Sequence, residues 1–298
     1  MKKGIIIFLL LLCIGGGIFF YQYKFSGKKQ DEPKTEEPPK EETNIYASYN
    51  EEEMNYLNNL MGLKYYDETK IDRYLNYMDS DKYTYEEVIR VVNTNNDLEY
   101  FTDAVSANLE DGLLILVNKY NVLDEDYKPD DLKKVNSNYS YWGELREEAA
   151  DAFLTMAEAA SKEGLKLINT SPFRSYELQT KLYEGYSKRD GKAAADRYSA
   201  RPGFSEHQTG LATDIVSPTS NFDTFENTKE FTWLKNTAYK YGFILRYKKG
   251  MEYITGYMYE PWHYRYVGLD AAKTIYESDL TFEEYYYYYV KKQTNESV

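Results

Sequence analysis

The placement of the histidines is the feature that most constrains how this chain can fold. The 298 residues include only two histidines, and both lie in the C-terminal third. His207 stands in the segment 203–214 (GFSEHQTGLATD), seven residues before Asp214. His263 stands three residues after Glu260, in the stretch EPWH. Two imidazoles and one carboxylate can hold a catalytic zinc ion and leave its fourth position open. In a fold that uses these residues, the segment 203–214 must lie next to the segment 260–263.

Neither pair is specific evidence by itself, because a lone histidine is more often a packed or solvated side chain than a metal ligand. Two observations strengthen the zinc interpretation. Gly203 and Gly210 flank the first histidine and allow the backbone to turn sharply there. Asp214 falls in an apolar stretch, where an unpaired carboxylate would be costly and a metal ion would remove that cost. We predict one Zn2+ ion, held by His207, Asp214 and His263.

Glu260 and Arg174 fit the chemistry of such a site. Glu260 is close enough to His263 in sequence to take the proton of a water whose pKa zinc lowers towards ~7. Arg174 follows a predicted strand and is flanked by Ser171 and Ser175. Its guanidinium can stabilise an oxyanion or bind a substrate carboxylate through two parallel hydrogen bonds, although the pattern also suits a surface arginine in a turn. We predict catalytic roles for Glu260 and Arg174.

Residues 1–24 are typical of a transmembrane anchor. Residues 4–20 carry no charge and follow Lys2 and Lys3, and with its flanks this run is just long enough to cross a bilayer. The positive-inside rule places the basic start in the cytoplasm and the rest of the chain outside. Two alternatives stay open. One is a cleaved signal peptide, for which no A-x-A site is present. The other is a lipoprotein signal at Cys13, for which the preceding residue is not small.

The next two segments differ in composition. Residues 25–43 mix Pro, Glu and Lys with a single apolar side chain, so they cannot bury enough surface to fold and should form a disordered linker. Residues 44–110 show apolar residues at helical spacing and helix start signals at Asn50 and Thr84. They form either a small binding or spacer module or an extension packed on the next domain. The net charge of −13 argues against a nucleic-acid partner, which needs clustered Lys and Arg.

Residues 111–284 are predicted to form an α+β domain. Short apolar stretches occur among amphipathic helices and short loops, which favours a largely antiparallel central sheet with flanking helices. A C-terminal helix and tail follow over 285–298, with five consecutive tyrosines at 285–289 and a capping box that begins at Thr281. We expect helices over 144–163, 176–198 (broken near 190–191) and 226–241, and strands over 113–117, 165–170, 211–216, 243–246, 253–255 and 263–267.

Four segments of this domain resemble motifs of the VanY-like D-alanyl-D-alanine carboxypeptidases. GFSEHQTGLATD (203–214) and ITGYMYEPWHYRYVG (254–268) are similar to the two zinc motifs of that family. SPFRSYELQ (171–179) is similar to its arginine motif, and LLILVNKYNVLDEDYKP (113–129) to its opening segment. The likeness covers roughly 111–284 in the family's order. The family belongs to a superfamily of zinc peptidases that also includes the hedgehog signalling domain fold.

The resemblance implies the same three zinc ligands and the same general base as the residue pattern. It adds substrate-binding roles for Arg174, Gln179 and Ser205, with Ser205 beside the metal. Two departures from the family pattern, at 172–173 and at Lys248, affect neither a ligand nor the base. They bear only on the shape of the substrate cleft.

The function that the resemblance implies is that of a zinc carboxypeptidase. Residues 1–24 imply that a single span anchors it in a bacterial cell membrane, with its catalytic domain outside the cell. Its expected substrates are peptidoglycan stem peptides, from which it removes the C-terminal D-alanine. The sequence leaves D,D and L,D specificity open. A peptidoglycan endopeptidase on the same scaffold and a non-catalytic, zinc-containing wall-binding domain are alternatives. The non-catalytic domain would have no use for an acidic side chain such as Glu260 beside the open zinc position.

Overall fold

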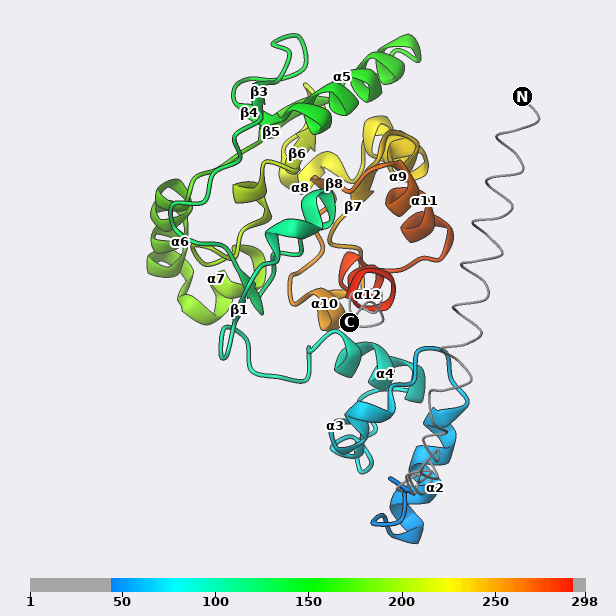
Figure 1. Cartoon of the computed structure of the whole chain (residues 1–298). Helices are drawn as coiled ribbons and strands as arrows, with labels where there is room; N and C mark the ends of the chain where they lie inside the picture. Colours follow the sequence, from blue (N-terminus) through cyan, green and yellow to red (C-terminus); the bar gives the residue numbers. More distant parts are fainter. Residues whose placement is uncertain (1–43, 292–298) are drawn as a thin grey trace, which may run out of the picture. The chain divides into compact units, whose positions relative to one another are not determined.

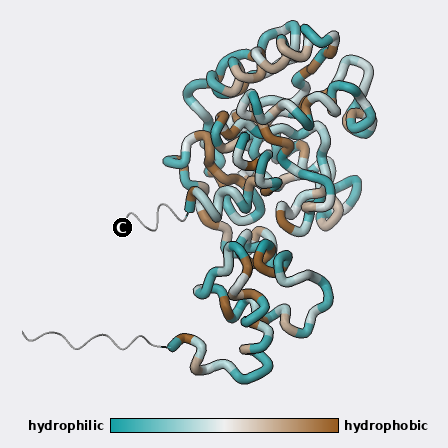
Figure 2. Tube along the Cα trace, turned by 90° about the vertical axis from the view of Figure 1, so that its right-hand side faces the viewer, coloured by the Kyte–Doolittle hydropathy of each residue, from teal (hydrophilic) through white to brown (hydrophobic). Residues whose placement is uncertain are grey.

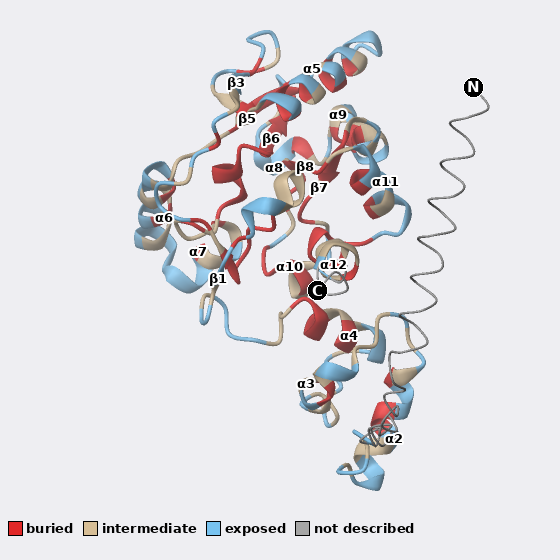
Figure 3. Ribbon diagram, viewed as in Figure 1, coloured by how far each residue is buried: buried red, intermediate tan, exposed pale blue. Residues whose placement is uncertain are grey.

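In the computed structural model, which describes residues 44–291, a four-stranded sheet forms the centre of the fold (Figure 1). The strand order is β5-β6-β8-β7, and every neighbouring pair is antiparallel. β6 and β8 are buried along their whole length (Figure 3). The prediction of an α+β domain with an antiparallel sheet is confirmed. The strands are Ile168–Ser171 (β5), Ala212–Val216 (β6), Phe243–Leu245 (β7) and His263–Tyr266 (β8).

Amphipathic helices cover the sheet. The longest described helix, α5 (Glu147–Lys162), buries Phe153 and Met156 in the same apolar core as Ile215 of β6. Burial of each such side chain stabilises the fold by roughly 1.5–3 kcal/mol, and Figure 2 shows the hydrophobic segments gathered in the interior. The other helices of this part are α6 (Tyr176–Asp190), α7 (Lys192–Tyr198), η3 (Glu206–Thr209), α8 (Phe222–Phe225), α9 (Lys229–Thr237), η4 (Ala238–Tyr241), α10 (Glu252–Thr255) and α11 (Leu269–Glu277).

A helical segment precedes the sheet. The predicted helix starts at Asn50 and Thr84 are confirmed, since both residues cap a helix and form a complete capping box. Nε of Arg90 donates to Oε1 of Glu284 at 2.6 Å, which joins this segment to the C-terminal helices. The described residues from Tyr49 onward accordingly form one compact unit. The elements concerned are α2 (Glu51–Met61), η1 (Glu68–Lys70), α3 (Ile71–Leu75), α4 (Tyr85–Asn93), α12 (Phe282–Tyr285) and η5 (Tyr286–Val290).

Two predicted strands are wrong. The stretch 113–117 begins inside a short helix, η2 (Leu109–Leu114), and its later residues are buried without pairing in a sheet. Nη2 of Arg265 donates to the carbonyl oxygens of Leu113 and Ile115, both at 2.9 Å, so a side chain takes the place of a neighbouring strand. The stretch 253–255 belongs to the helix α10, which Gly256 ends with a φ of +74°.

Other elements differ from the predictions at their boundaries. The predicted helix 144–163 begins three residues later, because 144–146 form β4 (Glu144–Arg146), which pairs antiparallel with β3 (Leu132–Lys134). The predicted helix 226–241 is divided into α9 and η4. The expected break within 176–198 is confirmed at Gly191, which has a φ of +83°. Two short parallel strands, β1 (Val105–Ser106) and β2 (Asn121–Val122), complete the fold.

The predicted anchor lies outside the described residues. Within residues 44–291, no helix is long and apolar enough to cross a membrane. The linker 25–43 and the end of the predicted tail, from 292, also lie outside the described part of the chain. The domain boundaries near 111 and 285 stay predictions.

Candidate metal centre and active site

The three predicted zinc ligands come from the sheet and from a short helix beside it. Asp214 lies in the middle of β6, and the strand register pairs it with His263, the first residue of β8. His207 lies in η3, and Gly210 ends this helix with a φ of +69° just before β6. All three ligands are buried, and one ligand atom of each lies within 4.8 Å of the others. The fold thus brings together the residues that the sequence predicted.

The spacing of these atoms fits a tetrahedral ion. Oδ1 of Asp214 lies 3.5 Å from Nε2 of His207 and 3.3 Å from Nδ1 of His263. Ligands bound to tetrahedral zinc at about 2.0–2.2 Å lie about 3.3–3.6 Å apart. Oδ1 of Asp214 is buried, and neither histidine contact nor any other described group meets hydrogen-bond geometry with it. A buried carboxylate oxygen without a partner is costly, and a zinc ion among the three atoms would satisfy it.

Each imidazole is oriented by a contact on the side away from Asp214. Nδ1 of His207 lies 3.0 Å from the carbonyl oxygen of Pro172 and donates to it in the tautomer that leaves Nε2 free. Nε2 of His263 lies 3.4 Å from Oε2 of Glu206 and donates to it in the tautomer that leaves Nδ1 free. Acceptors of this kind commonly fix metal-binding histidines. In these neutral tautomers both rings turn a nitrogen that can bind a metal towards Asp214.

Glu260, the predicted general base, lies beside this centre. Its Oε2 is 3.5 Å from Nδ1 of His263, the same nitrogen that faces Asp214. Burial raises the pKa of Glu260 to about 8, and the Asp214 carboxylate adds to this rise, whereas His263 and Arg174 oppose it. Burial lowers the pKa of His263, but its contacts with Asp214 and Glu206 outweigh burial and raise that pKa to about 9. Zinc binding, which needs a neutral imidazole, therefore releases a proton.

A network of four fully buried charges lies next to His263. Oε1 of Glu206 accepts from Nε of Arg246 at 2.8 Å and from Nη1 of Arg265 at 3.0 Å. Arg246 also donates twice to the carboxylate of Glu283, at 2.8 and 2.5 Å. Burial would raise the pKa of Glu206, but the two arginines outweigh it and hold this pKa well below its usual range. Two positive and two negative charges thus compensate each other and fix the carboxylate that orients His263.

Arg174 reaches the same centre from the loop between β5 and α6. Its Nη2 lies 3.8 Å from Oδ2 of Asp214 and donates to Oγ of Ser171 at 2.7 Å. Its Nη1 donates to Oε1 of Gln179 at 2.6 Å. Nε2 of Gln179 in turn donates to the carbonyl oxygen of Ala200 at 2.6 Å. Gln179 therefore holds Arg174 in place, and direct substrate binding by Gln179 stays a prediction.

Ser205, the third predicted substrate-binding residue, is buried at the start of η3, next to Glu206. It stands two residues before the ligand His207 in the chain. Its contact with a terminal D-alanine stays a prediction.

Similar proteins agree with this geometry. Residues 143–269 match the family VanY, described as D-alanyl-D-alanine carboxypeptidase. The chain is 43% identical over 198 residues to the putative carboxypeptidase YodJ of Bacillus subtilis (strain 168), a match that covers 64% of this chain and 72% of the relative. The chain belongs to the VanY family. It is also 36% identical to a D-alanyl-D-alanine carboxypeptidase of Enterococcus faecalis, over 58% of this chain and 65% of the relative.

Two solved structures are similar to this VanY-family protein. The LD-carboxypeptidase LdcB shares 42% identity with a TM-score of 0.59, over 64% of this chain and 93% of LdcB. A D,D-pentapeptidase VanY solved with Zn(II) shares 34% identity with a TM-score of 0.50, over 58% of this chain and 97% of that VanY. The protein is accordingly a zinc peptidase of the D,D- or L,D-carboxypeptidase type, and its zinc site consists of His207, Asp214 and His263.

The buried charge network of this VanY-family chain was not predicted from its sequence. One signal was present, because Arg265 lies between two tyrosines in the predicted strand 263–267 and Arg246 ends another predicted strand. A charged residue in a buried strand needs a partner, which is the argument that singled out Asp214. Glu206 and Glu283 carry no such signal, because one lies in a loop motif and the other in a helix start.

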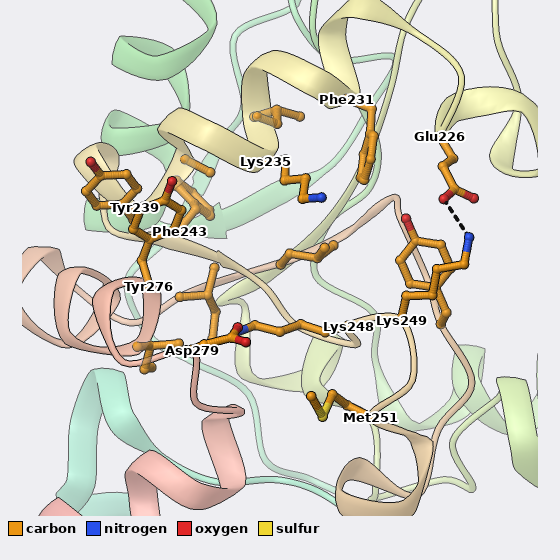
Figure 4. A pocket seen from close by; sticks show the side chains of 16 residues that line it. Glu226, Phe231, Lys235, Tyr239, Phe243, Lys248, Lys249, Met251, Tyr276 and Asp279 are labelled. Atoms are coloured by element: carbon orange, nitrogen blue, oxygen red, sulfur yellow. Dashed lines mark hydrogen bonds and ion pairs between the residues drawn. The ribbon is translucent and has the colours of Figure 1, made fainter.

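A cavity of about 380 Å³ lies elsewhere, beside α9, β7 and α11, and no residue of the metal centre lines it (Figure 4). Ion pairs engage two of its lysines. Lys249 lies 3.1 Å from Glu226, the pair joined by a dashed line in Figure 4, and Lys248 lies 2.9 Å from Asp279. This cavity is therefore distinct from the active site of the VanY-family enzyme.

Proposed function

We propose that this enzyme removes the C-terminal D-alanine from peptidoglycan stem peptides on the outside of a bacterial cell, held at the membrane by residues 1–24. The observation that carries the proposal is the position of Glu260. Its carboxylate is buried and lies 3.5 Å from the metal-facing nitrogen of His263. A purely structural zinc site has no use for an acidic group at this place. The uncharged run 4–20 supports the anchor.

Zinc and Glu260 have separate roles in peptide hydrolysis. Zinc, when bound by its three ligands, lowers the pKa of a water and polarises the substrate carbonyl. Glu260 accepts the proton of the attacking water at Oε2 and passes it to the nitrogen of the leaving D-alanine. Water oxygen thereby bonds to the carbonyl carbon, the C–N bond breaks, and the proton ends on the released amine.

Arg174 supplies positive charge to the same reaction. Ser171 and Gln179 hold its guanidinium near Asp214, at hydrogen-bond distances of 2.7 and 2.6 Å. In this position it neutralises either the oxyanion that develops on the scissile carbonyl or the terminal carboxylate of the peptide. The two acceptors that fix it, Ser171 and Gln179, leave other N–H groups of the guanidinium for the substrate.

The relatives indicate which stem to test first. The identity to the LD-carboxypeptidase LdcB is 42%, against 34% to the D,D-pentapeptidase VanY. We therefore propose that the tetrapeptide stem, in which the terminal D-alanine follows an L-configured centre, is the preferred substrate.

Mass spectrometry of defined stems tests the reaction. The full-length protein in detergent, loaded with zinc, is incubated with tetrapeptide and pentapeptide stems, and Glu260→Gln is the matched control. Loss of one alanine from the tetrapeptide supports the proposal. Loss of alanine from the pentapeptide alone makes the enzyme D,D-specific. Internal cleavage makes it an endopeptidase, and an intact stem in the presence of bound zinc makes it a non-catalytic binding domain.

Cell fractionation tests the location. We expect the protein in the membrane fraction after an alkaline wash, with its catalytic part accessible to protease added to intact cells. Release of the protein into the medium would contradict the anchor and would favour a cleaved signal peptide.

A further inference from the structure

The loop between β3 and β4 exposes two consecutive aromatic side chains. Tyr141 is 67% exposed and Trp142 is 55% exposed. Neither side chain makes a ring contact, a cation–π contact or a hydrogen bond within residues 44–291. The other exposed aromatic side chains of this part of the chain each lie against a second ring, with 3.9 to 5.8 Å between centroids: Tyr85, Tyr100, Phe222 and Tyr276. Tyr141 and Trp142 therefore form an aromatic surface that the described protein leaves uncovered, which is typical of a binding site.

The backbone of this loop is fixed on β5 of the central sheet (Figure 1). Ser140 pairs with Asn169 of β5, and the N–H of Tyr141 donates to the carbonyl oxygen of Asn169 at 3.3 Å. Nδ2 of Asn169, a fully buried residue, donates to Oγ of Ser140 at 2.9 Å. Oγ of Ser140 in turn donates to the carbonyl oxygen of Trp142 at 2.8 Å. A ligand would not have to order this loop, and this lowers the entropic cost of binding.

The same loop lies close to the metal centre. A Cβ atom placed on Gly143 would lie 2.1 Å from Cγ of Pro172, so the two residues are in direct contact. The carbonyl oxygen of Pro172 lies 3.0 Å from Nδ1 of His207. Only Gly143 and Pro172 thus separate Trp142 from a zinc ligand along this line of contacts. An extended stem of four residues spans at most about 14 Å, so a group attached to the far end of a bound stem can reach the loop.

The composition of the loop suits an uncharged, hydroxyl-rich ligand. Residues 135–143 (VNSNYSYWG) carry no charged side chain, in a chain of which 29% of the residues are charged. Asn136, Ser137 and Asn138 are exposed beside the aromatic pair and offer amide and hydroxyl groups for hydrogen bonds. The faces of the indole and phenol rings are electron-rich and attract the C–H groups of a sugar ring. A carbohydrate uses both kinds of contact.

We propose that Tyr141 and Trp142 bind a sugar ring of the peptidoglycan glycan strand while the stem peptide lies at the metal centre. This inference rests on the proposed peptidase function and extends its substrate from the stem peptide to the glycan that carries it. The sugar ring lies on the aromatic faces, and the polar side chains of the loop bind its hydroxyl and amide groups. The aromatic pair precedes residues 143–269, the segment that matches the family. The enzyme should therefore prefer a stem that is still attached to its glycan over a free stem.

Steady-state kinetics with two substrates test this preference. The zinc-loaded, full-length protein in detergent is given the stem that it hydrolyses, either free or linked to its amino-sugar disaccharide, and the release of alanine is measured. We expect a lower KM for the linked stem. Trp142→Ala should raise that KM by about threefold to tenfold. The KM of the free stem, the kcat of both substrates and the zinc content should not change.

Two comparisons make the kinetic result specific. The Tm of Trp142→Ala should equal that of the wild type, because the side chain is exposed and has no partner among the described residues. Leu269→Ala removes an apolar side chain of similar exposure, 59%, on α11 and should behave like the wild type. An equal rise of KM for both substrates would show that Trp142 contacts the peptide and would overturn the assignment to a sugar. Unchanged KM values for both substrates would overturn it as well.

A binding measurement separates this inference from the proposed function. Calorimetric titration uses an amino-sugar oligosaccharide that carries no peptide, so its result does not depend on hydrolysis. We expect a Kd of about 1 mM or tighter for the wild type and for Leu269→Ala. Tyr141→Ala and Trp142→Ala should each bind about threefold to tenfold more weakly. Absence of oligosaccharide binding by the wild type, or binding that both variants leave unchanged, refutes the inference whether or not stems are hydrolysed. Intact stems together with the expected binding would refute only the peptidase function.

Discussion

Replacing Glu206 by Gln tests the buried charge network that orients His263. The carboxylate is fully buried and accepts from Arg246 at 2.8 Å and from Arg265 at 3.0 Å. Glu206→Gln keeps the shape of the side chain but leaves a buried positive charge uncompensated. Removing one partner of a buried ion pair costs about 3–5 kcal/mol, and in a unit of this size each kcal/mol lowers the Tm by about 2–4 °C. We expect the Tm of the metal-free protein to fall by roughly 6–20 °C.

The same substitution should weaken zinc binding. Nε2 of His263 lies 3.4 Å from Glu206, and a neutral amide is a poorer acceptor for this N–H than a carboxylate. Loss of such an outer partner typically reduces metal affinity by about 10–100-fold. Glu283→Gln separates the two effects, because it removes a charge next to Arg246 but leaves the contact between Glu206 and His263. It should lower the Tm and change zinc affinity by less than about tenfold.

Differential scanning calorimetry of the chelator-treated protein and zinc titration against a chelating indicator measure the two quantities. Glu277→Gln is the matched control, since Glu277 pairs at 3.9 Å with Lys273 and both side chains are largely exposed. Exposed pairs contribute about 0–1 kcal/mol. If Glu206→Gln melted within about 3 °C of the wild type and bound zinc with unchanged affinity, the network would have no orienting role.

Three further predictions concern the zinc centre and the buried tyrosines. Glu260→Ala should keep bound zinc by metal analysis yet reduce stem hydrolysis by about 10²–10⁴-fold; retained activity, or loss of zinc, would show that this role is wrong. His207→Ala should abolish zinc binding, and full metal occupancy would refute its assignment as a ligand. The free energy of unfolding should fall as the pH rises from 10 towards 12. Burial raises the pKa of Tyr56, Tyr77 and Tyr287 from 10.0 to about 12. The folded state therefore keeps protons that the unfolded state loses, and stability that is complete below pH 10 is lost towards pH 12. Denaturant unfolding at a series of pH values, with tyrosinate absorbance, checks this; a constant free energy over this interval would contradict it.

Local sequence pattern was sufficient to predict three strands of the central sheet, two of which hold zinc ligands. The predicted strands 211–216, 243–246 and 263–267 correspond to β6, β7 and β8. They are short, mostly apolar segments that helices and neighbouring strands cover, and a glycine stands directly beside each one in the sequence (Gly210, Gly242 and Gly268). The helix starts at Asn50 and Thr84 could also be predicted from the sequence, because a capping box is a contact between residues that lie three positions apart in the chain.

The same kind of pattern failed at 113–117 and 253–255. A short apolar run is compatible with a strand, a buried helical turn or a buried extended segment. These structures differ in the groups that form hydrogen bonds with the backbone of the run. At 113–117 this group is the guanidinium of Arg265, which lies more than a hundred residues further along the chain. At 253–255 the chain forms a helical turn, which Gly256 closes.

The sequence by itself determined the kind of chemistry at the site. Two histidines in the whole chain, each near a carboxylate, left His207, Asp214, His263 and Glu260 as the natural members of a zinc site. Residue type decides whether a group can bind a metal or carry a proton, and residue type is fully visible in the sequence. Only the tertiary structure decided that Oδ1 of Asp214 lies between Nε2 of His207 and Nδ1 of His263 without a hydrogen-bond partner among the described residues. It alone also showed how Glu206, Arg246, Arg265 and Glu283 compensate one another next to that site. The physical reason is that ligand spacing and charge compensation depend on distances of a few ångströms between residues that are far apart in the chain.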